Sequence, residues 1–284
     1  MTTETLGPTL SASIVGASAG PLTQTIDARW VMAYNAALGD ALPRPVAHPL
    51  FAVCYEWPVA VALREQAIGA AIAPLSVHAT HELVIHRPPR AGDRLTTTAT
   101  VAEVVQRPSG ALVLTRFVTV DTAGQSVTTT TYGSLYRGVT VIGELGRPDG
   151  RGIVRPAGGD TATFENAAWT ETVAVAANAA HVYTECARIW NPIHTDEGVA
   201  RAAGLPGIIL HGTATLALCI ARVVSRDLGD DPARVHGVSA RFTGMVTLPS
   251  TFVLRAARPT ARGIAFDAVG RDGRPILSQG ALST

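Results

Sequence analysis

The feature that most constrains the fold is a long apolar segment in the second half of the chain, residues 213–224. Leu216, Ile220 and Val223 recur there at close to the 3.6-residue helical period, and small or apolar residues fill most positions between them. A helix that is apolar on nearly every side must be covered by other structure. We therefore expect a buried helix with a β-sheet wrapped against it.

A turn that carries a histidine precedes this helix. Pro192 fixes its own φ angle and disfavours helical backbone at Asn191, so the segment Asn-Pro-Ile-His predicts a rigid turn that projects His194. Thr195 or Asp196 can then cap a short helix. The imidazole of His194 is thus expected beside well-ordered backbone.

The buried helix is predicted to begin near His211. At its start, Gly212 and Thr213 have backbone N–H groups without intrahelical partners, and the helix dipole favours a carbonyl oxygen or an anion there. The sequence therefore places a titratable imidazole, that of His194, only a short helix away from an oxyanion-type donor site.

Composition limits the classes of function. The chain has 284 residues, of which 47% are hydrophobic, so it can form one large or two moderate domains, each with a core. A net charge of +1 predicts neither a nucleic acid nor a membrane partner. Widely spaced Cys54, Cys186 and Cys219 predict reduced thiols and no metal site. We expect a cytoplasmic protein, since no secretory signal or membrane-spanning run is recognised.

The first half predicts two helices followed by strands. Residues 28–38 predict a short helix, and Pro58 predicts a turn before a second helix over residues 59–68. Alternating threonine and valine residues predict half-buried antiparallel strands within residues 78–137. Residues 1–25 predict a frayed terminus, with an edge strand as the alternative.

The order of elements divides the chain in two. Residues 139–160 are rich in glycine, proline and arginine and predict a linker between an N-terminal domain, residues 1–138, and a C-terminal domain, residues 161–284. A helix, a strand, a proline-containing turn and another strand follow one another in both halves. We therefore expect an α+β fold with two curved antiparallel sheets, each wrapped around a central helix.

The residues around His194 resemble the signature of the MaoC-like (R)-specific enoyl-CoA hydratases, the hydratase 2 family. That signature is roughly Gly-Asp-x-Asn-Pro-(Ile/Leu)-His-x-Asp, followed by a helix that opens with His-Gly. The matching residues are Asn191, Pro192, Ile193, His194, Asp196, His211 and Gly212. The resemblance implies a double-hotdog fold in which the first half, without the signature, helps to line an acyl pocket. It also implies a homodimer or higher homo-oligomer.

The resemblance also implies a substrate and residue roles. The substrate would be an acyl thioester that carries CoA or a carrier-protein phosphopantetheine, with no further cofactor and no metal. His194 would be the acid/base, the Gly212 amide would polarise the thioester carbonyl, and Asn191 would orient the turn or the water. The other predicted substrate contacts are His211, Thr213 and Ile189. A purely structural hydrogen-bonding role is the favoured alternative for His211.

One position departs from the family pattern. Ile189, preceded by Arg188 in place of glycine, stands where the family has its catalytic aspartate. An isoleucine side chain can neither hold water nor exchange a proton. Three alternatives are open. Glu185 can supply the missing acid, a carboxylate such as Glu56 or Glu65 can arrive from the first half, or His194 can act alone.

The sequence thus predicts a hydro-lyase, acting as a 2-enoyl-thioester hydratase or in reverse as a 3-hydroxyacyl-thioester dehydratase. Arg188 beside an apolar Ile189 would remove negative charge from the pocket and keep His194 neutral. This favours two alternatives. One is a different reaction on an acyl or polyketide thioester, such as a specialised dehydration, an isomerisation or a cyclisation. The other is a non-catalytic acyl-thioester binder.

Overall fold

The computed structural model describes residues 7–39, 46–144, 164 and 167–284. Its helices are α1 Ala28–Ala37, α2 Ala52–Ala67, α3 Ala179–Ala187, α4 Glu197–Ala202 and α5 Gly212–Asp227. Its strands are β1 Thr9–Ser11, β2 Ser18–Thr25, β3 Ser76–Ile85, β4 Arg94–Arg107, β5 Gly110–Val120, β6 Ser126–Arg137, β7 Thr140–Ile142, β8 Trp169–Val175, β9 Gly237–Phe242, β10 Ser250–Ala256, β11 Ile264–Gly270 and β12 Pro275–Ser283.

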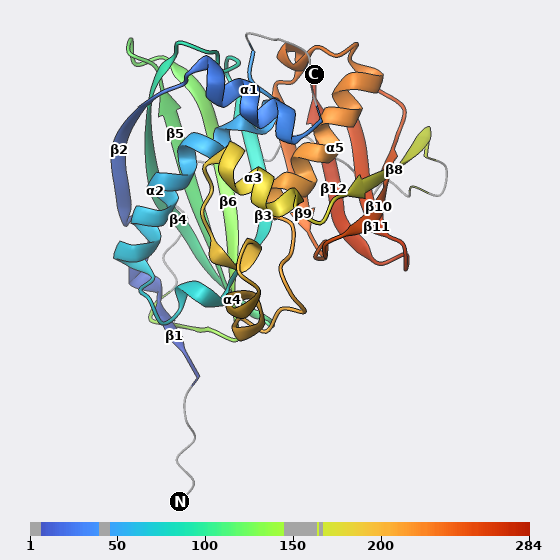
Figure 1. Ribbon diagram of the computed structural model, residues 1–284. Helices are drawn as coiled ribbons and strands as arrows, with labels where there is room; N and C mark the ends of the chain where they lie inside the picture. The colour runs from blue at the N-terminus through green and yellow to red at the C-terminus, as the bar shows by residue number, and fades with distance from the viewer. Residues whose placement is uncertain (1–6, 40–45, 145–163, 165–166) are drawn as a thin grey trace, which may run out of the picture.

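A single antiparallel sheet of ten strands crosses the molecule in the order β2-β4-β5-β6-β3-β9-β12-β11-β10-β8 (Figure 1). The first five strands come from the first half of the chain and the last five, in mirrored order, from the second half. The halves meet where β3 pairs with β9, with Thr80 opposite Arg241 and Val84 opposite Gly237. The α+β prediction is confirmed, and the two expected sheets prove to be joined edge to edge.

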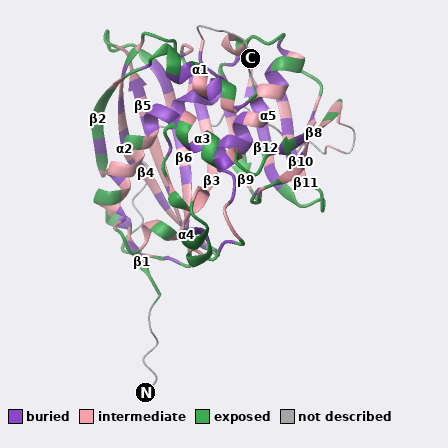
Figure 2. Ribbon diagram, viewed as in Figure 1, coloured by how far each residue is buried: buried purple, intermediate pink, exposed green. Residues whose placement is uncertain are grey.

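The predicted buried helix is α5. Leu216, Ile220 and Val223 have no exposed surface, and they belong to one core cluster with Phe252 of β10 and Phe266 of β11. Figure 2 shows the strands mostly buried or half-buried, with exposed residues gathered on loops and outer helix surfaces. The sheet of the second half is therefore wrapped against α5, as the apolar pattern predicts.

In the first half, α2 takes the place that α5 has in the second. Its residues Val59 and Leu63 pack in a second core cluster with Val101 of β4 and with Val113 and Phe117 of β5. Each half thus has its own central helix against its own part of the sheet. The start of α5 and one face of α2 border the cavity described below, which lies between the halves.

Two expectations about the first half are wrong. The helix predicted to begin after Pro58 begins at Ala52 instead, and Pro58 lies inside it. The buried residues on both sides of the proline, such as Tyr55 and Val59, favour one continuous packed helix over a turn. Residues 18–25 are not frayed, because they form the edge strand β2 against β4, which was the alternative.

The predicted linker begins with ordered structure. Within residues 139–160, Thr140–Ile142 form strand β7, which pairs in parallel with β1. Hydrogen bonding to the N-terminal strand attaches these residues to the first half. The remainder of the predicted linker from residue 145 lies outside the described residues.

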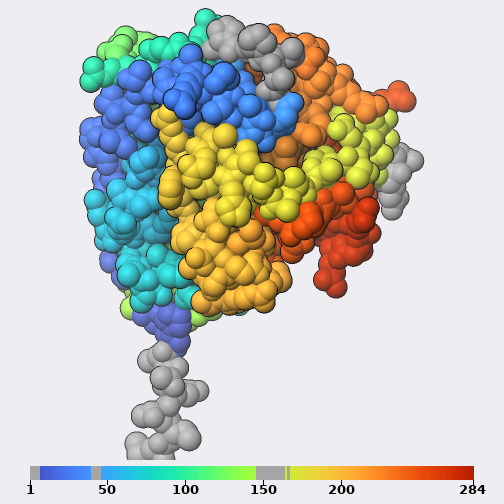
Figure 3. Space-filling model, in the orientation of Figure 1, coloured from blue at the N-terminus to red at the C-terminus, as the bar shows by residue number. Residues whose placement is uncertain are grey.

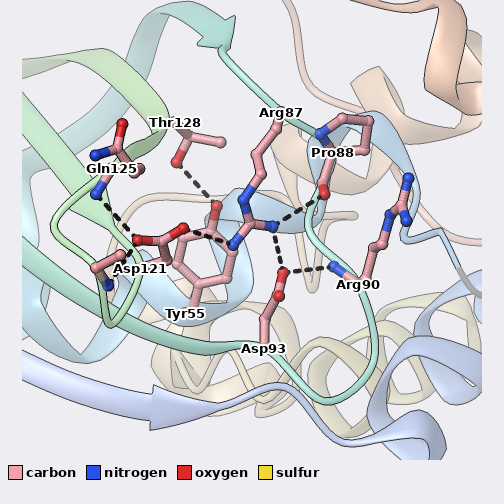
Figure 4. A network of polar contacts seen from close by, with 9 residues as sticks. Tyr55, Arg87, Pro88, Arg90, Asp93, Asp121, Gln125 and Thr128 are labelled. Atoms are coloured by element: carbon pink, nitrogen blue, oxygen red, sulfur yellow. Dashed lines mark hydrogen bonds and ion pairs between the residues drawn. The ribbon is translucent and has the colours of Figure 1, made fainter.

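Arg87 forms ion pairs with aspartates in two turns of the first half (Figure 4). Arg87, just after β3, donates from Nη1 to Asp93 at 2.7 Å and contacts Asp121 with Nη2 at 3.4 Å. The second carboxylate oxygen of Asp121 accepts the backbone N–H of Gln125 at 3.0 Å, which closes the turn between β5 and β6. In the same view the hydroxyl of Tyr55 lies 2.9 Å from that of Thr128 and links α2 to β6.

The described part of the chain contains no helix that is both long enough and apolar enough to cross a membrane. Cys54, Cys186 and Cys219 are free thiols, and the first and last of them are buried.

Candidate active site

The turn predicted around His194 is present. Asn191 is extended, and its side-chain oxygen accepts the backbone N–H of Ile193 at 3.4 Å, so residues 192–194 form one 3-10 turn. Asp196 then caps α4 by accepting the N–H of Val199 at 2.9 Å. Local hydrogen bonds on both sides therefore hold the histidine in place.

One ring nitrogen of His194 is bound and the other is free for chemistry. Nδ1 lies 2.8 Å from the backbone carbonyl oxygen of Ile209. Since a carbonyl only accepts, Nδ1 carries the hydrogen and Nε2 carries the lone pair. Nε2 has no hydrogen-bond partner in the described part of the chain. Burial lowers the pKa of His194 to about 4, while the Ile209 carbonyl acts in the opposite direction. The imidazole is therefore neutral near pH 7 and able to take a proton.

Arg188 is not the group that keeps His194 neutral. Its guanidinium pairs with Asp27 at 3.2 Å and lies 4.1 Å above the ring of Trp30, on the outside of α1. Its backbone has a φ of 58°, the left-handed region that glycine favours and that the family pattern fills with glycine. Ile189 follows with its side chain buried. The expectation about Arg188 is corrected, because burial, and not the guanidinium of Arg188, lowers the pKa of His194.

His211 stacks on His194. The two ring centroids are 3.7 Å apart with the planes inclined by 24°. His211 is 3% exposed, and its Nε2 lies 3.3 Å from the hydroxyl of Thr184. Burial first, and then the neighbouring His194, hold the pKa of His211 well below 6.5. This geometry fits the structural role favoured for His211, although its ring also borders the cavity.

The start of α5 lies beside the two histidines. His211 caps the helix with extended backbone, so Gly212 is its first helical residue. A Cβ atom on Gly212 would lie 3.0 Å from the ring of Phe242, so the position favours glycine. Thr213 accepts a hydrogen bond from the buried hydroxyl of Tyr183 at 3.1 Å. The first helical residue of α5 thus has no side chain of its own beside its N–H group.

These groups border one cavity of about 170 Å³ between the two halves of the chain. From the second half it is lined by residues that include Ile189, Asn191, His194, His211, Gly212 and Thr213. From the first half it is lined by residues that include Val53, Glu56, Trp57, Ala60, Arg64, His78, Phe117 and Tyr132. Figure 3 shows the second-half segment around the turn (yellow to orange) lying against the first-half segment that holds α2 (cyan).

Glu185 and Glu65 are predicted candidate acids that do not border this cavity. On α3, Tyr183 and Ala187 face the core, whereas Glu185 is exposed on the other side of the helix. Glu65, on α2, is exposed as well. Neither carboxylate is placed to replace the aspartate.

Glu56 is the carboxylate that does border the cavity. It is 3% exposed, and its Oε1 accepts a hydrogen bond from Thr130 at 2.6 Å. Burial raises the pKa of Glu56 from 4.5 to about 7, against the lowering effect of Thr130. The sequence feature that could have singled out Glu56 is that it is the one carboxylate within the apolar first part of α2.

A small aromatic cluster in the cavity wall was missed. The ring of His78 stacks on Tyr132 with centroids 3.7 Å apart and lies 4.2 Å from Phe242. His78 lies near the start of β3 and Phe242 ends β9, so the pairing of β3 with β9 brings them together. No pattern of neighbouring residues in the sequence predicts a contact between side chains so far apart along the chain. Across the described ranges no three His, Cys, Asp or Glu side chains are grouped so as to hold a metal ion.

Comparisons with known sequences divide the chain in the same way as the strands. Residues 163–267 match the family described as MaoC like domain, and residues 13–130 match the FAS1-like, dehydratase domain region. An enoyl-CoA hydratase of Mycobacterium tuberculosis is 35% identical over 89 residues, 31% of each protein. A probable enoyl-CoA hydratase 2 of Dictyostelium discoideum is 24% identical over 186 residues, 65% of this chain and 61% of that protein. The matches thus span less than two thirds of these relatives.

Solved structures establish the fold. A MaoC-like dehydratase from Phytophthora capsici has a TM-score of 0.80 at 21% identity, with 95% of both chains covered. A Mycobacterium tuberculosis protein described as a double hotdog has a TM-score of 0.60 at 17% identity, with 95% of this chain and 96% of that chain covered. The fold is therefore the double hotdog, and its second half carries the match to the MaoC-like domain family, over residues 163–267.

Proposed function

We propose that this protein is a 2-enoyl-thioester hydratase, or in reverse a 3-hydroxyacyl-thioester dehydratase, with the (R) stereochemistry of the hydratase 2 family. One observation carries the proposal. The neutral imidazole of His194 and the unpartnered N–H groups at the start of α5 border the same cavity. Addition of water to an enoyl thioester requires a base that activates the water at C3. It also requires a donor that stabilises the negative charge on the thioester oxygen.

The reaction follows from this placement. His194 Nε2 removes a proton from water while the water oxygen bonds to C3 of the enoyl group. The double-bond electrons move toward C2 and the thioester oxygen, which becomes enolate-like. The Gly212 N–H donates to that oxygen from a fixed position at the cavity wall, and a fixed donor needs no reorganisation as the charge develops. Protonation at C2 completes the addition, and dehydration runs through the same steps in reverse.

The lining of the cavity supports an acyl thioester as the substrate. Its first-half wall includes the apolar side chains of Val53, Ala60 and Phe117, which suit an acyl chain. We propose that the substrate arrives as a CoA or phosphopantetheine thioester and that the reaction needs no other cofactor. The first half then acts as the acyl-binding half.

The first test is a direct assay. Purified protein is incubated with crotonyl-CoA and with a longer 2-enoyl-CoA, and the absorbance of the conjugated thioester is followed. We expect turnover at a kcat within the ordinary range of roughly 1–10³ s⁻¹, and chiral analysis should give the (R)-3-hydroxyacyl product. A protein that binds both thioesters without consuming either would contradict the proposal.

A second candidate is an isomerase or cyclase acting on an acyl thioester. It is favoured by the apolar wall at Ile189, which is 5% exposed and borders the cavity. Under this candidate Ile189→Asp creates a hydratase activity that the wild type lacks, because the new carboxyl group can hold water. Ile189→Asn, of matching shape but unable to exchange a proton, should remain inactive. Rates of both variants on crotonyl-CoA measure this, and an Ile189→Asp variant that binds acyl-CoA yet stays inert would count against the candidate.

A further inference from the structure

We propose that Glu56, from the central helix of the first half, is the catalytic carboxyl group that exchanges the C2 proton of the substrate while His194 exchanges the proton of water. The inference rests on the proposed function, since it concerns the same cavity. It assigns a catalytic residue to the half of the chain that lacks the family signature. The active site is then built from both hotdogs.

The helical spacing of α2 directs Glu56 into the cavity. Val53, Glu56, Trp57, Ala60 and Arg64 all line it, and their separations of three, one, three and four residues define one face of a helix. The long side chain of Glu56 lies on this face with the others. His194 borders the same cavity from the opposite half.

Two hydrogen bonds to β6 hold this part of α2. Thr128 and Thr130 alternate along the strand, so their hydroxyls lie on one face of it. Thr130 donates to Oε1 of Glu56 at 2.6 Å, and Thr128 lies 2.9 Å from the hydroxyl of Tyr55 (Figure 4). The Oε2 atom of Glu56 has no hydrogen-bond partner among the residues described here. One oxygen is therefore fixed, and the other remains available to a ligand.

The carboxyl group has no structural counterion. Among described residues Glu56 forms no ion pair, and the donor to its Oε1, Thr130, is uncharged. Burying a carboxyl group without a cation costs stability. A buried acid that borders a cavity, is held by one oxygen and titrates near neutral pH has the properties of a general acid or base.

Other titratable groups face Glu56, and burial sets the charge of most of them. They are Cys54, Tyr55 and Arg64 on α2, His78 on β3, Tyr132 on β6, and His194 and His211 across the cavity. Burial raises the pKa of Cys54, Tyr55 and Tyr132, and it lowers the pKa of all three histidines. Two arginines that line the cavity carry positive charge: Arg64, with its guanidinium 5.0 Å from the ring of Trp57, and Arg137 at the end of β6. Within this set of groups, Glu56 is the one that gains or loses its proton near pH 7.

The proton balance of hydration is then complete. The water oxygen bonds to C3, and its proton passes to Nε2 of His194. The protonated carboxyl of Glu56 gives its proton to C2, and the enolate-like electrons return to form the C2–H bond and restore the carbonyl. The proton on His194 returns to the Glu56 carboxylate through water in the cavity. One water is consumed, and both residues regain their starting states.

Glu56→Gln tests the assignment, with Glu65→Gln as the control on the same helix. Glutamine keeps the shape and an oxygen that can accept from Thr130, but it cannot exchange a proton. We expect kcat for 2-enoyl-CoA hydration to fall by about 10²–10⁴-fold with little change in KM. Glu65→Gln should keep the wild-type rate, since Glu65 is exposed and outside the cavity.

The pH profile separates a catalytic role from a structural one. Because Glu56 must be protonated to act on C2, wild-type kcat/KM for hydration should fall as the pH rises through about 7. This fall should be absent in Glu56→Gln. Thr130→Val removes the hydrogen bond that lowers the pKa of Glu56, so the midpoint should move to higher pH.

The outcomes distinguish this inference from the proposed function. A Glu56→Gln enzyme with the wild-type rate and pH profile, beside an inactive His194→Ala enzyme, overturns the role of Glu56 and leaves the hydratase in place. A wild type that consumes no enoyl thioester overturns both. If Glu56→Gln fails to fold in a thermal melt, Thr130→Val decides. A shifted midpoint supports the assignment, and an unmoved midpoint overturns it.

Discussion

Replacing His194 with alanine should lower the rate of 2-enoyl-CoA hydration by about 10²–10⁴-fold, the usual contribution of a positioned general base. The imidazole is neutral because burial lowers its pKa to about 4, and its Nδ1–H is committed to the Ile209 carbonyl. Alanine has no nitrogen in the place of Nε2, so nothing there can accept the proton of water. The measurement is kcat with crotonyl-CoA, accompanied by a thermal melt to show that the variant is folded.

His86→Ala is the matched control for that experiment. His86 is an exposed histidine just after β3, with Nε2 3.0 Å from the hydroxyl of Thr129, and it does not border the cavity. Its removal should leave kcat unchanged. A folded His194→Ala enzyme that retains the wild-type rate would mean that the base lies elsewhere and would remove the central support for the proposed chemistry.

Gly212→Pro should lower kcat by a further 10²–10³-fold relative to Gly212→Ala, about what one oxyanion donor contributes. Proline at the first helical position removes only an N–H that has no intrahelical partner, so α5 itself should tolerate it. His211 already has the extended backbone, with φ −56° and ψ 137°, that a residue before proline prefers. Both variants carry a Cβ atom, and proline in addition replaces the N–H hydrogen by its ring.

The alanine variant isolates the steric part of the effect. Its Cβ would lie 3.0 Å from the ring of Phe242, so some loss of rate is expected from crowding alone. Steady-state rates and melting temperatures of both variants are compared with those of the wild type. Equal rates for Gly212→Pro and Gly212→Ala would show that crowding, and not the missing donor, accounts for the loss.

Local patterns predicted the elements closest to the site correctly. The apolar segment at residues 213–224 is the buried core of α5, and Pro192 lies in a rigid turn that presents His194. Asp196 caps the following helix as expected. These features depend on backbone geometry and side chains within a few residues, and such information is contained in a short stretch of sequence.

Patterns failed where long-range packing overrode a local preference. Pro58 was expected to begin a helix, yet the buried residues on either side of it keep α2 continuous. Arg188 was expected to keep His194 neutral, but its guanidinium is directed to Asp27 on α1. The direction of a long side chain depends on a partner that is distant in sequence.

The sequence by itself determined the central helix of the second half, the histidine turn and the family resemblance, because each is a property of consecutive residues. Only the tertiary structure decided which carboxylate borders the cavity. The sequence does not distinguish Glu185, Glu65 and Glu56 as candidate acids. Of the three, only Glu56 lies on a helix face that borders the cavity. Its raised pKa has the same origin, since burial depends on the joint between two halves that are far apart along the chain.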